Sequence, residues 1–169
     1  MTKRAPLAPK HNRKDAPEAQ DFALETFLPY RLSLLSNTVS EGIAVAYRDV
    51  HDLSLTEWRV VAILGRFPDL TATDIMARGA LDKVPVSRAV ARLEERGLVR
   101  RKADSEDRRR LTLRLTPGGV RLFNAVVPEA LAYEDRLLSA LAPEEIHQFE
   151  HLLDRLLASA RALNEPGRR

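Results

Sequence analysis

Residues 71–116, TATDIMARGALDKVPVSRAVARLEERGLVRRKADSEDRRRLTLRLT, contain the pattern that decides the fold. Thr71 and Asp74 have the spacing of a capping box, with Asp in place of the usual Glu, and they open a short helix that ends at Gly79. Asp82 follows only three residues later and caps a second helix. Two short helices joined by a tight turn that contains glycine are typical of a helix-turn-helix.

The second helix of this pair runs to about Arg96, carries a proline in its first turn and ends at a glycine. At 100° per residue it has one apolar face and one face that is basic, hydroxyl-bearing and otherwise small. Short side chains allow a helix to approach the DNA major groove, whereas an ordinary solvated helix carries mixed long charges. The apolar face comprises Val86, Ala89, Val90, Leu93 and Gly97, and the opposite face comprises Lys83, Val84, Ser87, Arg88 and Ala91.

Two strand-like runs follow, Leu98–Lys102 and Arg110–Leu115, and the second alternates apolar and polar residues as a half-buried strand does. A short polar segment joins them, so we predict a β-hairpin. Its tip, Asp104–Arg110, places three consecutive arginines beside acidic residues. Such a wing suits the narrow, electronegative minor groove, although by itself the tip could equally be a self-neutralised solvated turn.

Helices are also predicted on both sides of this region. Apolar residues recur there at helical spacing, and prolines and threonines mark the starts. Before the helix-turn-helix we predict one helix from a first turn containing Pro29 to about Asp49, and a second from a Thr56 cap to a stop at Gly65 and Pro68. After the hairpin we predict a helix from Thr116 and Pro117 to about Leu141, with an interruption and kink at Pro128. A last helix begins at Pro143.

The composition sets further limits. With 169 residues, 44% of them hydrophobic, the chain can bury a core, and the absence of cysteine excludes disulfides, thiolate metal sites and thiol redox sensing. The formal charge of +3 is uneven, because residues 78–114 carry +6 and residues 1–20 carry +3, while both remaining segments are acidic. A basic segment on an otherwise neutral body indicates a surface that binds a polyanion. No run is apolar enough for a membrane span, and the basic start lacks the apolar core of a signal peptide, so we predict a cytoplasmic protein.

Enzyme chemistry has little support. The sequence contains no phosphate-binding glycine loop and no nucleophile elbow, and we predict no catalytic residue and no cofactor. His147 and His151 have the spacing of metal ligands on one helix, but both lie opposite its apolar face, so we predict solvent exposure rather than a metal site.

In these stretches the sequence resembles the MarR (multiple-antibiotic-resistance regulator) family of bacterial transcription factors. The resemblance covers about residues 28–163, and the wing motif followed by Leu-x-Leu-Thr is its most specific part. It implies a winged helix-turn-helix homodimer, usually a repressor that a small aromatic or phenolic ligand releases from its operator. The matching stretches, in family order, are Leu55-Thr56-Glu57-Trp58, Leu93–Arg100, Asp104-x-x-Asp107-Arg108-Arg109 and Leu113-x-Leu115-Thr116-x-x-Gly119.

The resemblance also implies which residues contact DNA. Lys83–Arg92 becomes the helix that reads the groove, and Pro85 within it restricts the first turn. Arg109 becomes the minor-groove side chain and Asp107 the carboxylate that orients it. Arg108 is then a phosphate contact or a strand-edge charge. The predicted DNA-binding residues are Thr73, Lys83, Pro85, Ser87, Arg88, Arg92, Asp107, Arg108 and Arg109.

The resemblance further implies an effector pocket between the dimerisation helices and the DNA-binding part. Arg31 or Arg59 would pair with an anionic group, and Tyr30 or Trp58 would flank an aromatic ring. The structural alternatives are that Trp58 fills the core and that Arg59 makes a salt bridge. The segment around Tyr30 resembles relatives that respond to aromatic acids or their coenzyme A thioesters. The predicted ligand-binding residues are Tyr30, Arg31, Ser36, Asn37, His51, Trp58 and Arg59.

We therefore predict a mainly α (α+β) fold: a winged helix-turn-helix with a two-stranded β-hairpin wing, plus N- and C-terminal helices whose apolar faces pair in a two-fold dimer on a pseudo-palindromic double-stranded DNA operator. A winged-helix module that binds protein, and a DNA-binding protein without an effector, remain alternatives. The predicted domains are a disordered basic arm (1–20), a dimerisation helix (21–54), the DNA-binding domain (55–115) and C-terminal dimerisation helices (116–165).

Overall fold

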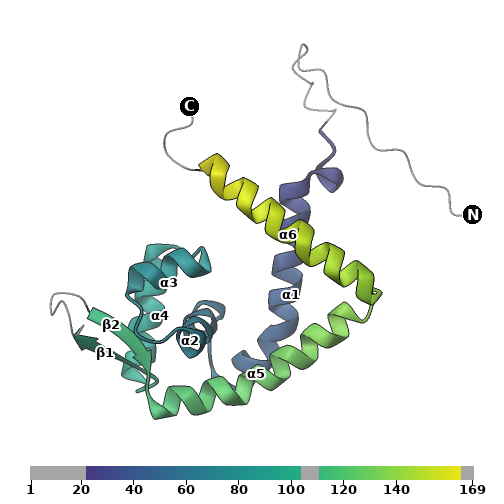
Figure 1. Cartoon of the computed structure of the whole chain (residues 1–169). Coiled ribbons are helices and arrows are strands. Elements are labelled where there is room, and N and C mark those ends of the chain that lie inside the picture. The colour runs from purple at the N-terminus through teal and green to yellow at the C-terminus, as the bar shows by residue number, and fades with distance from the viewer. Residues whose placement is uncertain (1–21, 104–110, 165–169) are drawn as a thin grey trace, which may run out of the picture. The chain divides into compact units, whose positions relative to one another are not determined.

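The computed structural model describes residues 22–103 and 111–164 (Figure 1). It forms two compact units, one up to Val39 and one from Ser40, and each is described by itself. The predicted basic arm and the tip of the predicted wing lie outside the described residues. The elements are a 3-10 turn at Leu24–Thr26, α1 (Leu28–His51), α2 (Leu55–Arg66), α3 (Ala72–Gly79), α4 (Lys83–Glu95), β1 (Val99–Ala103), β2 (Leu111–Leu115), α5 (Pro117–Leu138) and α6 (Pro143–Asn164).

Helix α2 begins two residues earlier than predicted. Ser54, not Thr56, is the N-cap: its hydroxyl accepts from the Glu57 amide at 3.3 Å, and Glu57 Oε2 accepts from the Ser54 amide at 2.7 Å. The reason is the spacing of the capping box, which requires the carboxylate three residues after the cap. The predicted stop at Gly65 and Pro68 is confirmed, because the helix ends between these residues, at Arg66.

The predicted limits of α3 and α4 are confirmed. Thr71 and Asp74 form the capping box of α3, with both reciprocal hydrogen bonds present. Asp82 is the N-cap of α4, although its side chain makes no capping hydrogen bond. Gly97 ends α4 in the left-handed conformation (φ 66°), and the Leu98 amide donates back to the Leu93 carbonyl at 2.9 Å. This is the geometry in which glycine has no steric penalty.

Helix α5 starts as predicted and differs in its middle. Thr116 caps it by accepting from the Gly119 amide at 3.1 Å. The predicted interruption at Pro128 is wrong, since α5 continues through this residue and ends at Leu138. A proline removes one backbone hydrogen bond, and we attribute the continuation to packing, because Leu122 and Val126 immediately before it are buried in the core.

The core lies among α2, α3, α4 and the antiparallel β1–β2 hairpin, in which Val99 pairs with Leu115 (Figure 1). The Leu113 amide also donates to the Leu70 carbonyl at 2.7 Å, which adds a single bridge to the hairpin. The last turns of α1 and the first half of α5 also contribute buried side chains to this core. The buried apolar residues are Ala44, Tyr47, Leu53, Val60, Val61, Leu64, Ile75, Val86, Ala89, Val90, Leu93, Val99, Leu113, Leu122 and Val126.

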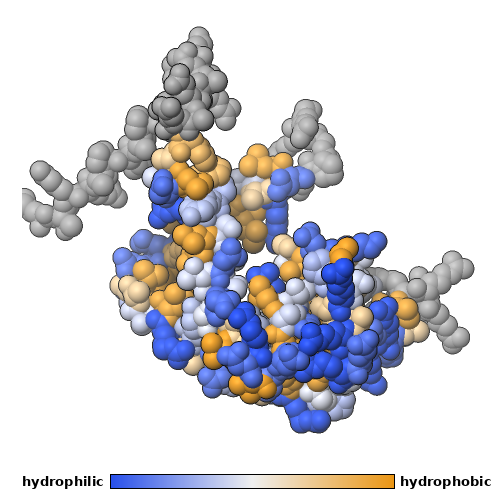
Figure 2. Space-filling view, turned by 180° about the vertical axis from the view of Figure 1, so that it is seen from behind, coloured by the Kyte–Doolittle hydropathy of each residue, from blue (hydrophilic) through white to orange (hydrophobic). Residues whose placement is uncertain are grey.

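Helix α6 and the first half of α1 differ from these core elements, because few of their apolar side chains are shielded from solvent. None of the residues of α6 is buried, and the large apolar side chains on it are 42% or more exposed from Phe149 onward. In the unit up to Val39, Leu28, Tyr30 and Leu34 are 40–53% exposed. Figure 2 shows hydrophobic side chains at the surface as patches among hydrophilic ones. None of the described helices combines the length and apolar character of a membrane span.

Candidate nucleic-acid interface and effector cavity

Helix α4 has the two faces predicted for it. Val86, Ala89 and Leu93 are buried against the core, so their helix is fixed in place by packing. The prediction fails at Gly97, which is exposed, because the chain leaves the helix there in the left-handed conformation. The exposed residues of the outer face are Lys83, Val84, Pro85, Ser87, Arg88 and Ala91.

The cations of α4 separate into two groups. Arg92 and Arg96, near its end, bind groups at the end of α1 and the start of α2. Lys83 and Arg88, nearer its start, have no ion pair within residues 22–103 and 111–164. A basic side chain without an internal partner keeps its full charge for a polyanion. The first half of α4 is thus the basic, small-residue face that a major groove accommodates.

A hollow of about 300 Å³ lies between the start of α2 and α4 and is lined by Thr56, Pro85 and Arg88, among others. The N-terminal amides of a helix and a nearby guanidinium together suit a phosphate oxygen. Thr73 lies exposed in the first turn of α3, a second helix start beside α4. These two helix starts supply candidate backbone contacts around the groove-reading face.

Two of the arginines on the strands of the hairpin are held in ion pairs. Arg101 pairs with Glu94 at 2.9 Å and Arg114 with Asp69 at 2.7 Å, while Arg100 stands directly opposite Arg114 in the sheet. These pairs anchor the hairpin to α4 and to the α2–α3 loop. The residues predicted for the wing tip, Asp107, Arg108 and Arg109, lie outside the described residues.

Four of the predicted effector residues, Tyr30, Arg31, Ser36 and Asn37, lie in the first half of α1, within the unit that ends at Val39. Tyr30 and Arg31 line an apolar hollow of about 440 Å³, together with Leu34. Ser36 and Asn37 are exposed on the same helix. This hollow places a guanidinium beside an aromatic ring, and ligand binding there stays a prediction.

The predicted effector residues after Ser40 have different surroundings. The Trp58 ring is stacked between Tyr47 (5.9 Å between centroids) and Phe123 (6.4 Å), which is the structural alternative considered for it. Arg59 is half-buried. Burial raises the pKa of Tyr47 above its ordinary value, because the phenolate would be charged in a largely apolar site.

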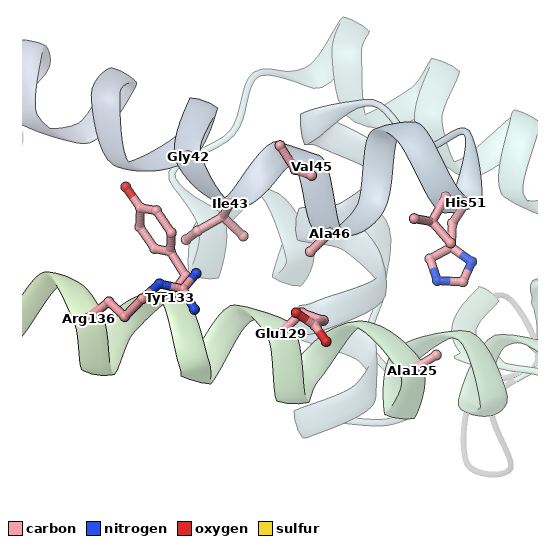
Figure 3. Close-up of a pocket in the computed structure, with 10 residues that line it drawn as sticks. Gly42, Ile43, Val45, Ala46, His51, Ala125, Glu129, Tyr133 and Arg136 are labelled. Carbon is pink, nitrogen blue, oxygen red and sulfur yellow. The ribbon is translucent and has the colours of Figure 1, made fainter.

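His51 lines a cavity of about 380 Å³ between α1 and α5 (Figure 3). Tyr133 and Arg136 lie at one end of the cavity, His51 at the other, and Glu129 between them. An aromatic ring, a guanidinium, an imidazole and a carboxylate around an apolar floor can bind a small ring that carries an acid and a hydroxyl group. The lining residues are Gly42, Ile43, Val45, Ala46, Val50, His51, Ala125, Glu129, Tyr133 and Arg136.

Sequence reasoning missed every residue of this cavity except His51. Small residues line the cavity on both helices, Gly42 and Ala46 on α1 and Ala125 on α5, and small residues leave space between helices. A Cβ atom at position 42 would collide with the Tyr133 hydroxyl. Gly42 itself is the one signal in the sequence that could have indicated this cavity. A glycine in the middle of a long helix weakens the helix, so its presence points to a close contact with another element.

No cluster of three or more potential metal ligands occurs among the described residues. His147 and His151 are both exposed on α6, as predicted, and His147 Nδ1 lies 3.1 Å from the Pro143 carbonyl.

Comparison with known proteins gives a consistent result. The sequence model of the MarR family matches residues 51–110. The HTH-type transcriptional regulator MhqR of Bacillus subtilis is 30% identical over 66% of this chain and 77% of its own length. The homoprotocatechuate degradative operon repressor of Escherichia coli is 27% identical over 68% of this chain and 78% of its own. The crystal structure of the MarR family regulator SPO1453 from Silicibacter pomeroyi has a TM-score of 0.72 at 31% identity, covering 83% of this chain and 99% of that one.

Proposed function

The chain belongs to the MarR family of winged-helix transcriptional regulators, and we propose that it is a homodimeric repressor that a small aromatic acid releases from its operator. The observation that carries the proposal is the outer face of α4, basic and otherwise small, with Lys83 and Arg88 free of ion pairs in the described part of the chain. The MarR-type relatives are transcriptional regulators rather than enzymes.

For DNA binding, α4 would enter the major groove. Ser87 and Arg88 would read base edges, and Lys83 and Thr73 would contact phosphates. Pro85 would restrict the first turn. Arg109 would reach the minor groove with Asp107 holding it, and Arg108 would contact phosphate, as the family resemblance implies. We propose that the protein acts in the cytoplasm, where its operator is.

For the dimer, we propose that a second copy covers the exposed apolar faces of α6 and of the first half of α1. On α6, five side chains between Phe149 and Leu157 have exposed fractions of 42–53%. An isolated face of this kind is costly in water, and a two-fold dimer would bury it on both copies at once. Two equivalent α4 helices then match the two halves of a palindromic operator.

For the effector, the name of the Escherichia coli relative refers to an operon that degrades an aromatic acid. We place the effector in the α1–α5 cavity, with its carboxylate on Arg136, its ring against Tyr133 and a ring hydroxyl near His51 or Glu129. The hollow beside Tyr30 and Arg31 is the second candidate site, because it also joins a guanidinium to an aromatic ring.

The DNA-binding proposal is tested with a fragment from upstream of the protein's own gene. We expect binding that weakens steeply with salt concentration and exceeds binding to a scrambled fragment by at least 10³-fold. Equal binding to both fragments at low salt, with the dimer intact in sedimentation, would instead favour a winged-helix module that binds protein.

The effector proposal is tested with a panel of hydroxylated aromatic acids and their coenzyme A thioesters, scored by release of the fragment. Arg136→Ala should abolish release at ligand concentrations that act on the unaltered protein, while Arg31→Ala should leave it intact. The reverse pattern would move the effector to the hollow in the first half of α1. Release by no member of the panel would favour a regulator without a small-molecule effector.

A further inference from the structure

Two arginines at the end of α4, Arg92 in its last turn and Arg96 at its C-cap, bind groups of the protein itself. Arg96 donates from Nη1 to the Asp52 carbonyl and from Nη2 to the His51 carbonyl, each at 2.8 Å. Arg92 donates from Nη2 to Asp52 Oδ2 at 2.8 Å, and its Nε lies 3.3 Å from Glu57 Oε1. All four partners belong to the end of α1 or the start of α2.

The end of α1 is shaped to receive Arg96. Asp52 adopts the left-handed conformation (φ 50°), which turns the chain sharply away from the helix axis. The last carbonyls of a helix have no intrahelical partner and carry the negative end of its dipole. A guanidinium that donates to two of them at once satisfies both, and its planar fork fixes the direction from which it approaches.

Arg92 is held from two sides. Asp52 is a largely exposed carboxylate, whereas the side chain of Glu57 is 2% exposed and is fixed by the capping box of α2. Among the described residues Glu57 Oε1 accepts no hydrogen bond, so the guanidinium of Arg92 is what balances this buried oxygen. A buried carboxylate that loses its cation is strongly destabilised. A DNA phosphate would therefore have to compete with two carboxylates for Arg92.

We propose that Arg92 and Arg96 are positioning residues: with Asp52 they form a clamp that fixes the end of α4 to the end of α1, and they affect DNA binding by placing α4 rather than by contacting DNA. The proposal rests on the proposed function, in which α4 reads the operator. It also gives the α1–α5 cavity a direct connection to α4, because His51 both lines the cavity and accepts from Arg96.

The effect of Asp52→Asn on operator affinity distinguishes a positioning role of Arg92 from a direct DNA contact. Removing a negative charge near a DNA-binding helix should strengthen binding to a polyanion if only charge matters. The clamp predicts weaker operator binding instead, by about 2- to 30-fold, which is the range for mutations that alter coupling within a contact network. The salt dependence should keep its slope, since no phosphate contact is lost, and the measurement is a titration of the labelled fragment at four salt concentrations.

Glu41→Gln is the matched control. Glu41 pairs with Arg48 at 2.8 Å on α1, and hydrogen bonding from this guanidinium lowers the pKa of Glu41 below its ordinary value, so the pair is ionic at neutral pH. The substitution removes the same charge and breaks a pair of the same length without touching α4. We expect operator affinity equal to or slightly above that of the unaltered protein. Equal behaviour of Asp52→Asn and Glu41→Gln would overturn the clamp.

Two further variants identify the arginines. Arg96→Lys keeps the charge but cannot span two carbonyls, so we expect it to weaken operator binding as Asp52→Asn does, whereas a phosphate contact would tolerate lysine. Arg92→Ala and Asp52→Asn should be non-additive in the double variant. A reduction of the salt slope by about 1 in Arg92→Ala, with additive effects, would make Arg92 a phosphate contact and overturn the proposal.

A readout without DNA separates failure of the clamp from failure of the proposed function. Amide hydrogen exchange in residues 88–96 should become faster in Asp52→Asn and stay unchanged in Glu41→Gln. If the unaltered protein binds no operator, the proposed function fails while this measurement still tests the clamp. Unchanged exchange in Asp52→Asn would show that the end of α4 does not depend on Asp52.

Discussion

Single residues in this protein derive their roles from their surroundings, and Tyr47 is the clearest case. Its ring is 1% exposed, stacks on Trp58, and places its hydroxyl 3.5 Å from the Ser40 carbonyl. Such a long contact contributes little, so the side chain acts mainly as an apolar ring that joins α1 to α2. Its burial raises its pKa, and that shift links Tyr47 to the stability of the fold.

We expect Tyr47 to make the protein less stable at alkaline pH. Because the folded state holds the phenolic proton to a higher pH than the unfolded state, this contribution is complete below the ordinary pKa of 10.0 and is lost as pH rises through the higher pKa of the folded protein. Urea unfolding between pH 8 and about pH 11.5 measures the loss, and Tyr47→Phe should reduce it. Tyr30→Phe, at an exposed tyrosine, serves as the control. The same alkaline loss in all three proteins would contradict the assignment.

At the scale of elements, three parts of α4 have three different roles. Its start carries Lys83 and Arg88, which form no ion pair with any described residue. Its buried face joins the core through Val86 and Leu93, and its end is held by Arg96. The helix wheel alone separates the first two, because burial follows the 3.6-residue period. The role of its end depends on which segment lies beside it.

Arg88→Ala should reduce discrimination between operator and scrambled DNA at little cost to the fold. We expect a loss of roughly 1–3 kcal/mol in operator binding if Arg88 contacts a base edge, and a change in unfolding free energy within about 0.5 kcal/mol, since the side chain is exposed. Competition titrations and urea unfolding measure the two quantities. Arg155→Ala, at an exposed arginine of α6, is the control and should change neither. A lower unfolding free energy with unchanged DNA discrimination would make Arg88 structural.

At the scale of the whole molecule, the apolar surface is unevenly satisfied. The region around α2, α3 and α4 buries a continuous core, while α6 buries no residue and exposes leucines along one face, Leu153 and Leu156 among them. On an isolated chain, exposed apolar area of this extent marks an association surface. The proposed dimer is the arrangement that would remove it from water.

If the proposed dimer forms through α6, the double variant Leu153→Glu, Leu156→Glu should be a monomer. Two carboxylates would have to be buried without cations at the interface, which is strongly unfavourable. Sedimentation velocity measures the change, and operator affinity should fall with it because one α4 then contacts only half a site. Arg155→Glu introduces a carboxylate at an exposed position of α6 that is already charged, and it should remain dimeric. A dimeric double variant would place the interface elsewhere.

Most of the fold follows from local patterns in the sequence. Capping residues, glycines and helical periodicity specify α3, α4 and the start of α5 within a residue or two, because these signals act over one turn of helix. The cap of α2 is Ser54 rather than the predicted Thr56, because only Ser54 stands three residues before Glu57 and can form a capping box with it. Pro128 was misjudged because the packing that keeps α5 continuous is not a local property.

The sequence by itself determined the helix-turn-helix, the hairpin, and the basic outer face of α4, all of which depend on residues close together in the chain. Only the tertiary structure decided that His51 faces Tyr133 and Arg136 across a cavity, and that Arg92 and Arg96 bind the end of α1 some 40 residues earlier. Contacts between distant segments depend on how helices pack, and packing is set by the shapes of whole faces rather than by spacing along the chain.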